Sequence, residues 1–306
     1  MKKNRLHSRR MLLAFLGLCL AVFFWAVNTV IARKVVFEIR PMTLSFYRWV
    51  TAFIIILPFG FAHLKNDKKE IVKNLGFLFI LSIPSVAVYN SVLYLGAQYT
   101  SATNISLVVA AMPVMTVFFS WIINNEKPMP GEFWGIVLSI LGMIVIAVRG
   151  SWQVLSDMSF NPGDILIVVS IASWALYSVL LKKKQILISP VSFLTILIGL
   201  GTICIFPFYV WEISLFKGID VNFNTILIFL YLGIFPSVLS YFFWNYGVKE
   251  AGPAMASIFM YLLPVFTCAI AWLVLGERLY PYHLAGGILI FSGLVLSVFR
   301  SFTRAF

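Results

Sequence analysis

The sequence predicts an all-α integral membrane protein with ten transmembrane helices, arranged as two inverted five-helix repeats. The chain of 306 residues is 61% hydrophobic and 11% charged, and its mean hydropathy is +0.97. Apolar runs of about 20 residues recur along it, each long enough to cross a bilayer as a helix. Landmark residues also recur at a spacing of 149: Trp25, Pro41 and Pro58 return as Trp174, Pro190 and Pro207.

The repeat continues through the rest of each half. A duplicated hydrophobic unit of about 140 residues is a common plan of secondary transporters, in which the substrate lies between two pseudo-symmetric halves. The repeat therefore favours a carrier among membrane proteins. The further matched residues are Pro84, Tyr89 and Tyr94 with Pro236, Tyr241 and Tyr246, then Pro113, Glu126, Gly135 and Gly142 with Pro264, Glu277, Gly286 and Gly293.

Ten apolar runs are the expected spans. The first repeat is expected at 11–149 and the second at 164–300, with 150–163 as the longest outer loop between them. The uncharged break at 96–100 is supported by its repeat partner at 249–253, which reads as a turn. The spans cover roughly 11–32, 42–62, 74–95, 101–123, 132–149, 164–182, 190–210, 224–246, 253–275 and 281–299.

The basic residues predict the orientation. With the N-terminus in the cytoplasm, 16 of the 23 Lys and Arg residues fall on the cytoplasmic side, including those of the 65–73 loop, as the positive-inside rule requires. Both termini are then cytoplasmic. Because each half has an odd number of spans, the second half enters the membrane from the opposite side, which makes the repeats inverted. The first apolar run is too long for a signal-peptide core and reads as an uncleaved span.

Composition excludes several classes of function. The net charge is +12, but the basic residues are scattered in short loops, so no nucleic-acid partner is expected. The three cysteines lie in apolar runs, and no His, Cys, Asp or Glu cluster has metal-ligand spacing. We therefore expect no catalytic residues, no metal and no cofactor. The expected partners are membrane lipid and a small-molecule metabolite.

Ionisable residues avoid the predicted span centres. All 11 acidic residues lie in loops or at span ends, which argues against a cation carrier and leaves proton coupling without an agent. A span-end acid such as Asp164 is the remaining candidate for coupling. Arg48 lies near the outer end of the second span, where snorkelling to the interface is expected. A contact with a substrate carboxylate is its alternative role.

Neutral polar and aromatic side chains are the candidates for substrate binding. Amides are costly in hydrocarbon unless paired, so Asn28 forms either a helix–helix hydrogen bond or a cavity wall. Tyr94, Trp244 and Tyr246 lie nearer a membrane face, where an aromatic belt is the alternative. The candidate substrate-binding residues are Trp25, Asn28, Tyr89, Asn90, Asn104, Trp174, Tyr177, Tyr241 and Tyr261.

Prolines and small residues predict the shape of the bundle. Pro84, Pro113, Pro236 and Pro264 lie inside spans and act either as fixed bends or as hinges. Small residues share one face of the fifth span and recur in the tenth, which lets helices approach closely. That packing lies either within the chain or in a homodimer. The small residues are Gly135, Ser139, Gly142, Gly286 and Gly293.

The tandem pattern resembles the EamA family of the drug/metabolite transporter superfamily, over almost the whole chain. The resemblance implies a ten-helix bundle in a bacterial inner (plasma) membrane that moves amino acids and related metabolites, often outward. Tyr177 departs from the pattern, since the first half has Asn28 at the matching place. The residues that carry the resemblance are Trp25-x-x-Asn28 with Lys34; Tyr99-Thr-Ser-Ala-Thr-Asn104 with Pro113 and Glu126; Gly252-Pro-Ala-Met-Ala-Ser257 with Pro264-Val265; and Leu275-Gly276-Glu277-Arg278-Leu279 with Gly286-Gly287.

Together these features predict a carrier that exports a small metabolite, such as an amino acid, by alternating access. A neutral, aromatic-lined interior suits a zwitterionic or uncharged substrate, because a net charge would need a buried counter-charge. A membrane-embedded enzyme, a channel and a structural membrane protein are the alternatives. Trans-stimulated exchange distinguishes the carrier from all three.

Overall fold

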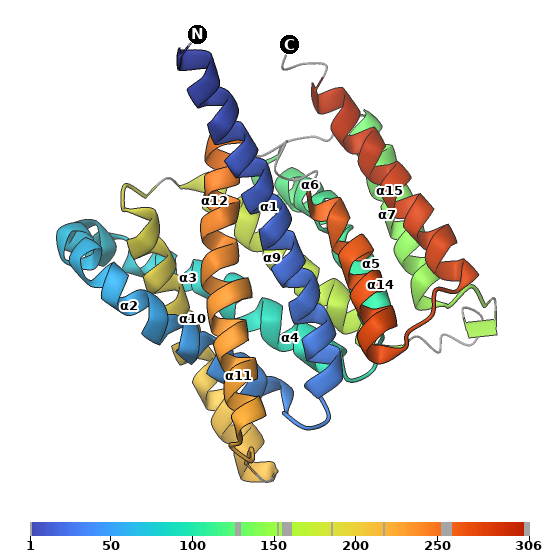
Figure 1. Ribbon diagram of the computed structural model, residues 1–306. Helices are drawn as coiled ribbons and strands as arrows, with labels where there is room; N and C mark the ends of the chain where they lie inside the picture. Colours follow the sequence, from blue (N-terminus) through green and yellow to red (C-terminus); the bar gives the residue numbers. More distant parts are fainter. Residues whose placement is uncertain are drawn as a thin grey trace.

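The computed structural model describes residues 2–125, 130–151, 153–154, 161–184, 186–216, 218–251 and 259–302. Every element in these ranges is a helix, and the helices form one bundle (Figure 1). The first helix begins and the last helix ends at the same end of that bundle. The predicted turn around Glu126 and the motif from Gly252 to Ser257 lie outside the described residues.

The first half contains five predicted spans, and each falls on helix. The third is interrupted by a π-helical segment, η1, and the fourth is divided into two helices. The elements are α1 (Lys2–Val35), α2 (Pro41–Lys73), α3 (Leu75–Ser82), η1 (Ile83–Val88), α4 (Tyr89–Gly96), α5 (Ala102–Val109), α6 (Met112–Asn124) and α7 (Pro130–Ala147).

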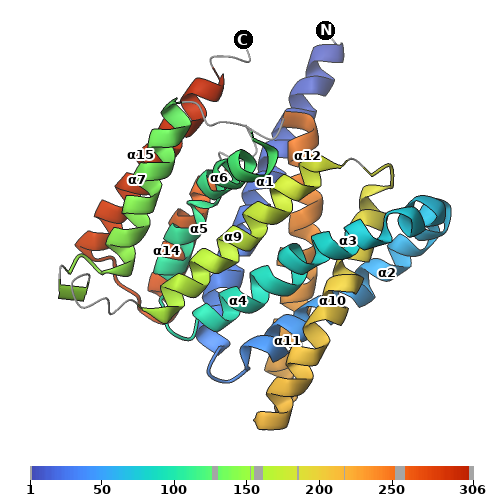
Figure 2. The ribbon, with the colours of Figure 1, turned by 180° about the vertical axis from the view of Figure 1, so that it is seen from behind.

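The second half repeats this order. A π-helical segment, η2, again interrupts the third predicted span, and a short 3₁₀ helix precedes the helix of the fourth. The elements are α9 (Pro162–Lys183), α10 (Pro190–Leu215), α11 (Phe223–Leu232), η2 (Gly233–Leu239), α12 (Ser240–Ala251), η3 (Phe259–Tyr261), α14 (Leu262–Leu275) and α15 (Pro281–Phe302). Figure 2 shows α1 and α9, the first helices of the two halves, running in opposite directions across the bundle.

The helices are long and apolar enough for a multi-pass membrane protein. Within the described residues, six meet the length and hydropathy of a span, and a seventh is added if α5 and α6 count as one span bent by 42°. The helical segments Phe133–Ala147 and Phe259–Leu275 are apolar but shorter. The all-helical membrane fold is thus confirmed, while the number of ten spans stays a prediction.

One expected bend is found, and one detail of the predicted spans is wrong. The run 101–123 was expected as a span with a bend or hinge at Pro113, and it breaks at Ala110–Ala111 with a bend of 42°, because Pro113 has no N–H to donate to the carbonyl of Val109. The basic stretch 65–73 was expected as a loop, but it continues α2 to Lys73. That stretch contains neither Gly nor Pro and is rich in good helix formers.

The π-helical segments place Pro84 and Pro236 at equivalent points of the two halves. Each bend is bonded by the first helix of the opposite half. Ser173 Oγ of α9 donates to the Pro84 carbonyl at 2.6 Å, and Trp25 Nε1 of α1 donates to the Pro236 carbonyl at 3.0 Å. The carbonyl groups of Pro84 and Pro236, in the π-helical turns of η1 and η2, are therefore hydrogen-bonded within the protein, as the interior of a membrane requires. These bonds hold both bends in the present conformation.

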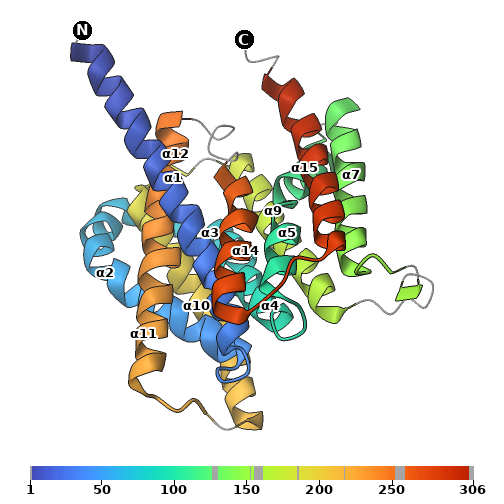
Figure 3. The same cartoon turned by 45° about the vertical axis from the view of Figure 1, so that its right-hand side comes forward.

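The small-residue face lies between α7 and α15, which run side by side at one flank of the bundle (Figure 3). A methyl group on Gly142 would stand 2.6 Å from the Gly286 carbonyl oxygen, and one on Gly293 would stand 2.5 Å from that of Gly135. The glycines thus allow backbone contact between the fifth helices of the two halves. Of the two predicted alternatives, packing within the chain is confirmed, and this face is not free to form a homodimer.

Carboxylates fasten α2 and α10 to each other. Glu212, near the end of α10, accepts from the N–H groups of Met42 and Thr43 at the start of α2, at 3.0 and 2.7 Å. Asp67, in the extension of α2, accepts from the N–H of Ser189 at the start of α10, at 2.9 Å. A carboxylate at a helix N-terminus pairs the otherwise free N–H groups and favours the helix dipole. The two halves therefore cap each other reciprocally.

Candidate functional site

A cavity of about 350 Å³ lies in the middle of the bundle, between the two halves. It is lined by α1, α2, α4, α5 and α6 of the first half and by α9, α12, η3 and α14 of the second. Aromatic and polar side chains make up much of its wall. The lining residues are Trp25, Asn28, Thr29, Arg48, Tyr89, Asn90, Leu93, Val109, Met112, Pro113, Thr116, Trp174, Ser178, Tyr241, Trp244, Met260 and Leu263.

A continuous series of aromatic rings forms one part of the wall. Trp25 packs against Trp244 and Tyr241, with ring centroids 5.4 and 6.4 Å apart. Trp174 packs against the same Tyr241 at 6.0 Å and against Tyr89 at 5.0 Å. The two repeat-related tryptophans thus contact the same tyrosine. Tilted and edge-on ring pairs of this kind fix the orientation of each ring.

A buried arginine forms the polar part of the wall. The Arg48 side chain is only 2% exposed, and its Nη1 donates to Asn28 Oδ1 at 3.1 Å, Asn90 Oδ1 at 2.7 Å and the Tyr94 hydroxyl at 2.6 Å. Its Nε donates to Ser237 Oγ at 2.7 Å. The expectation that this side chain snorkels to the membrane interface is wrong, because its guanidinium is buried and hydrogen-bonded inside the bundle.

All the hydrogen-bond partners of Arg48 are neutral. Among the described residues no carboxylate contacts the guanidinium, and the single ion pair found there, Lys73 with Glu70, lies at the end of α2. The amino group Nη2 donates to no group in the described ranges. The cavity is therefore lined by a positive charge that the protein orients but does not neutralise.

The position of Arg48 follows from the start of α2. Pro41 opens this helix, and Leu44, Ser45 and Ala52 lie on the same buried face as Arg48, at the helical spacings of three and four residues. Ser45 Oγ is 2.8 Å from Ser91 Oγ of α4, which fixes the rotation of α2. Ser45 and Arg48 are two polar residues at i and i+3 on an inward face of α2, and this pair is the sequence signal that could have indicated Arg48 as a cavity residue.

Six of the nine predicted site residues line the central cavity, and three lie elsewhere. Tyr177 does not line the cavity but packs against a residue that does, with its ring centroid 5.3 Å from that of Trp174. Tyr261 is not among the lining residues and packs against Phe291 and the cluster of Val114 and Ile136. Asn104 belongs to a separate polar cluster. The six that the cavity brings together are Trp25, Asn28, Tyr89, Asn90, Trp174 and Tyr241.

The cluster around Asn104 joins α5, α9 and α15. His283 accepts from the Tyr280 N–H at Nδ1, so its Nε2 carries the proton and donates to Asn104 Oδ1 at 2.9 Å. Asn104 Nδ2 contacts Asp164 Oδ1 at 3.4 Å, and Thr100 donates to the same oxygen. Asp164, the predicted span-end acid, is thus buried in a cluster separate from the central cavity.

Reasoning from the sequence missed several lining residues. Arg48 was expected to snorkel to the interface, with contact to a substrate carboxylate only as the alternative. Trp244 was expected nearer a membrane face, with an aromatic belt as its alternative, but it lines the cavity and packs against Trp25. The same alternative fails for Tyr94, which is fully buried and donates to Asn28 Oδ1 at 2.7 Å. The polar lining residues Thr29, Thr116 and Ser178 carried no distinguishing signal, because single hydroxyl groups are common in membrane helices.

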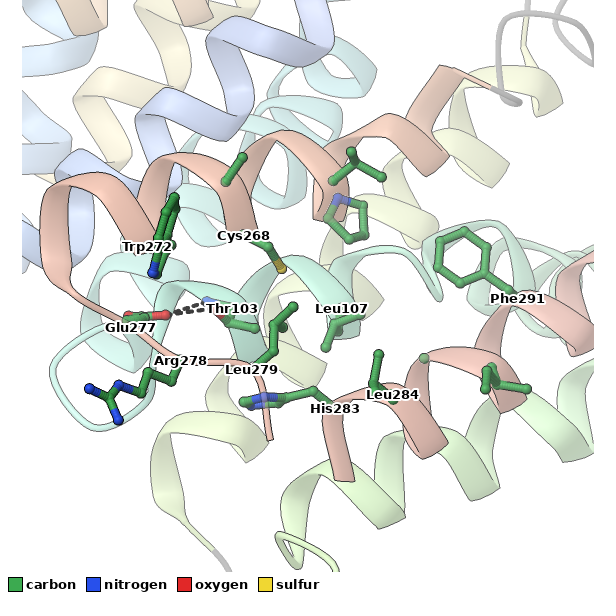
Figure 4. A pocket seen from close by; sticks show the side chains of 15 residues that line it. Thr103, Leu107, Cys268, Trp272, Glu277, Arg278, Leu279, His283, Leu284 and Phe291 are labelled. Carbon is green, nitrogen blue, oxygen red and sulfur yellow. Dashed lines mark hydrogen bonds between the residues drawn. The ribbon is translucent and has the colours of Figure 1, made fainter. Parts of the chain in front are cut away.

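A larger hollow of about 760 Å³ lies between α14, α15 and α5 (Figure 4). Its lining is mostly apolar, with Trp272 and Phe291 among its members. The hydrogen bond drawn there joins Glu277 to Thr103 and caps α5, so this carboxylate is already occupied. Polar and aromatic side chains from both halves make up most of the central cavity's lining, whereas this hollow is lined mostly by apolar ones, so the central cavity is the candidate site.

Comparison with known proteins assigns the chain to a family. The model of the EamA-like transporter family matches twice, at residues 12–148 and 161–299. An uncharacterized transporter of Archaeoglobus fulgidus is 27% identical over 92% of this chain and 95% of its own. The uncharacterized transporter YyaM of Bacillus subtilis is 28% identical over 74% of each chain. A probable amino-acid metabolite efflux pump of Salmonella typhimurium is 25% identical over 93% of this chain and 94% of its own.

A solved crystal structure has the same fold. It covers 95% of this chain and 97% of its own length, with a TM-score of 0.58 at 14% sequence identity. At that identity the likeness extends to the arrangement of helices alone.

Proposed function

Because the chain belongs to the EamA-like transporter family, we propose that it carries a small metabolite through the central cavity by alternating access. Family membership makes it a multi-pass membrane transporter and not an enzyme. The observation that carries the proposal is a cavity enclosed by polar and aromatic side chains from both halves. A carrier that rocks one half against the other needs its site at that boundary.

The proposed substrates are amino acids or related small metabolites, and the proposed direction is export. The Salmonella typhimurium relative, a probable amino-acid metabolite efflux pump, supports both. A volume of about 350 Å³ is at the small end of ligand cavities, which suits a metabolite of this size. The proposed binding residues are the six predicted ones in the wall, together with Arg48. The proposed architecture is ten spans in two inverted repeats, extending the confirmed all-helical membrane fold.

Counterflow in proteoliposomes tests the proposal. Vesicles loaded with millimolar amounts of each of the 20 proteinogenic amino acids in turn are given the same labelled amino acid outside. A carrier accumulates label above equilibrium in exchange for its substrate, whereas a channel only equilibrates it. We expect exchange without an imposed pH gradient, because no Asp, Glu or His is among the described residues that line the cavity. Absence of trans-stimulation for every amino acid contradicts the proposed substrate class.

The proposed location is the bacterial inner (plasma) membrane, with both termini in the cytoplasm. Asn66 lies exposed in the basic extension of α2, which the positive-inside rule assigns to the cytoplasm. A single cysteine introduced as Asn66→Cys, in a chain without Cys19, Cys204 and Cys268, should react with an impermeant maleimide only after the cells are opened. Labelling in intact cells would reverse the orientation.

A further inference from the structure

The unneutralised charge of Arg48 has a physical cost that the known contacts only partly offset. Burying a guanidinium is unfavourable unless it is paired and hydrogen-bonded. Four neutral oxygens from Asn28, Asn90, Tyr94 and Ser237 supply hydrogen bonds, but no described residue supplies negative charge. A buried arginine held in this way, on the wall of a cavity, is a site prepared for an anion.

We propose that Arg48 anchors the carboxylate of the transported substrate, so that this carrier selects small monocarboxylates, amino acids among them. The inference rests on the proposed function, which it deepens by naming the substrate class. It also replaces the expectation from sequence that the interior favours substrates without net charge, because the missing buried counter-charge is present in the protein.

The hydrogen bonds of Arg48 prepare it for this contact. Nε and Nη1 are held by acceptors from α1, α4 and η2, which leaves Nη2 without a partner in the described ranges. The guanidinium carbon also lies 4.9 Å from the centre of the Trp49 ring, which restrains the plane of the group. Because neutral acceptors orient an arginine without cancelling its charge, the attraction for a carboxylate oxygen is retained.

The rest of the cavity wall is expected to bind the amino group of a substrate more weakly than Arg48 binds its carboxylate. None of the lining residues is acidic, so an ammonium group would meet the faces of rings such as Trp25 and Trp174. Cation–π contacts contribute less than a charge-assisted hydrogen bond from a guanidinium to a carboxylate. The carboxylate should therefore be required for binding, whereas the amino group should be dispensable.

The competing explanation is that Arg48 only joins helices, since its partners come from three other elements. Asn28→Asp separates the two roles. The aspartate keeps the oxygen that accepts from Arg48, and the amide nitrogen it replaces makes no hydrogen bond with the described residues. If Arg48 only joins helices, Asn28→Asp gives it an ion pair and the protein still binds its substrate. If Arg48 binds the substrate carboxylate, the new carboxylate in Asn28→Asp neutralises its charge and substrate binding weakens.

The test measures binding to the purified protein in detergent by isothermal titration calorimetry, with each of the 20 proteinogenic amino acids as probe. The best binder is then compared with its carboxamide and with the carboxylic acid that lacks the amino group. We expect the carboxamide to bind at least about tenfold more weakly and the deaminated acid to bind measurably. Asn28→Asp should weaken carboxylate binding by at least about tenfold while leaving the melting temperature unchanged or higher.

Matched variants complete the design. Asn66→Asp makes the same chemical change at an exposed position of α2 and should bind like the wild type. Arg48→Lys keeps the charge without the planar fork and should retain part of the preference for acid over amide, whereas Arg48→Met should lose it. If Arg48→Met fails to fold, Asn28→Asp alone decides.

The outcomes distinguish the inference from the proposed function. Equal binding of acid and amide, unchanged binding by Asn28→Asp, or no binding of any carboxylate overturns the inference. Counterflow that shows no preference for the acid over the amide leaves the proposed function standing and removes the role of Arg48. Carboxylate binding that depends on Arg48, without counterflow, leaves the anion site standing and removes the proposed transport of amino acids.

Discussion

Trp174→Ala should remove most of the transport activity while leaving folded protein in the membrane. The Trp174 ring is the centre of the aromatic wall, with Tyr89, Tyr177 and Tyr241 at centroid distances of 5.0, 5.3 and 6.0 Å. Each aromatic contact contributes about 0.5–1.5 kcal/mol beyond the area it buries, so loss of the ring displaces two other cavity residues. We expect counterflow per folded molecule to fall at least about tenfold, with folded protein quantified by size-exclusion chromatography.

Trp211→Ala is the matched control for this prediction. Trp211 is 63% exposed on α10, so the same substitution there removes a ring without changing the cavity. Transport should stay close to that of the wild type. Trp174→Phe should recover part of the lost activity, because it restores an aromatic face. Normal counterflow in Trp174→Ala would show that the wall does not act on the substrate.

The repeat predicted part of the wall of the central cavity. Trp25 and Trp174, which stand at equivalent positions of the two repeats, both contact Tyr241. The pattern required no knowledge of helix tilt, because it compares one half with the other. For the same reason it selected residues with repeat partners and passed over Arg48, whose equivalent in the second half is Leu197.

The errors arose from treating position in the sequence as depth in the membrane. Arg48 is seven residues after the start of α2, which places it near a membrane face only if the helix is upright. Figure 2 shows α2 steeply inclined to α1, and its first turns, including Leu44, Ser45 and Arg48, are buried in the protein. Similarly, the break at Ala110–Ala111 bends the fourth predicted span by 42°. That bend separates Asn104 from cavity residues such as Met112, and no periodicity counted across it could have shown this.

Glu212→Ala should destabilise the protein more than any other single substitution at the junction of α2 and α10. Glu212 is 7% exposed and accepts from the N–H of Met42 and from both the N–H and the hydroxyl of Thr43, at 2.7–3.0 Å. Each buried donor left without an acceptor costs about 1–3 kcal/mol. Because α2 also carries Arg48, fraying of its first turns should weaken substrate binding as well as lower the melting temperature.

Glu38→Ala provides the comparison for this effect. Glu38 is exposed beside the same junction, and its carboxylate accepts no hydrogen bond from the described residues, so its removal should leave the melting temperature almost unchanged. Glu212→Gln keeps one acceptor oxygen and should fall between the alanine variant and the wild type. The measurement is thermal unfolding in detergent, followed by size-exclusion chromatography. Equal melting temperatures for Glu212→Ala and Glu38→Ala would show that the carboxylate cap of α2 contributes nothing to stability, and that the other contacts of α2 hold Arg48 at the cavity.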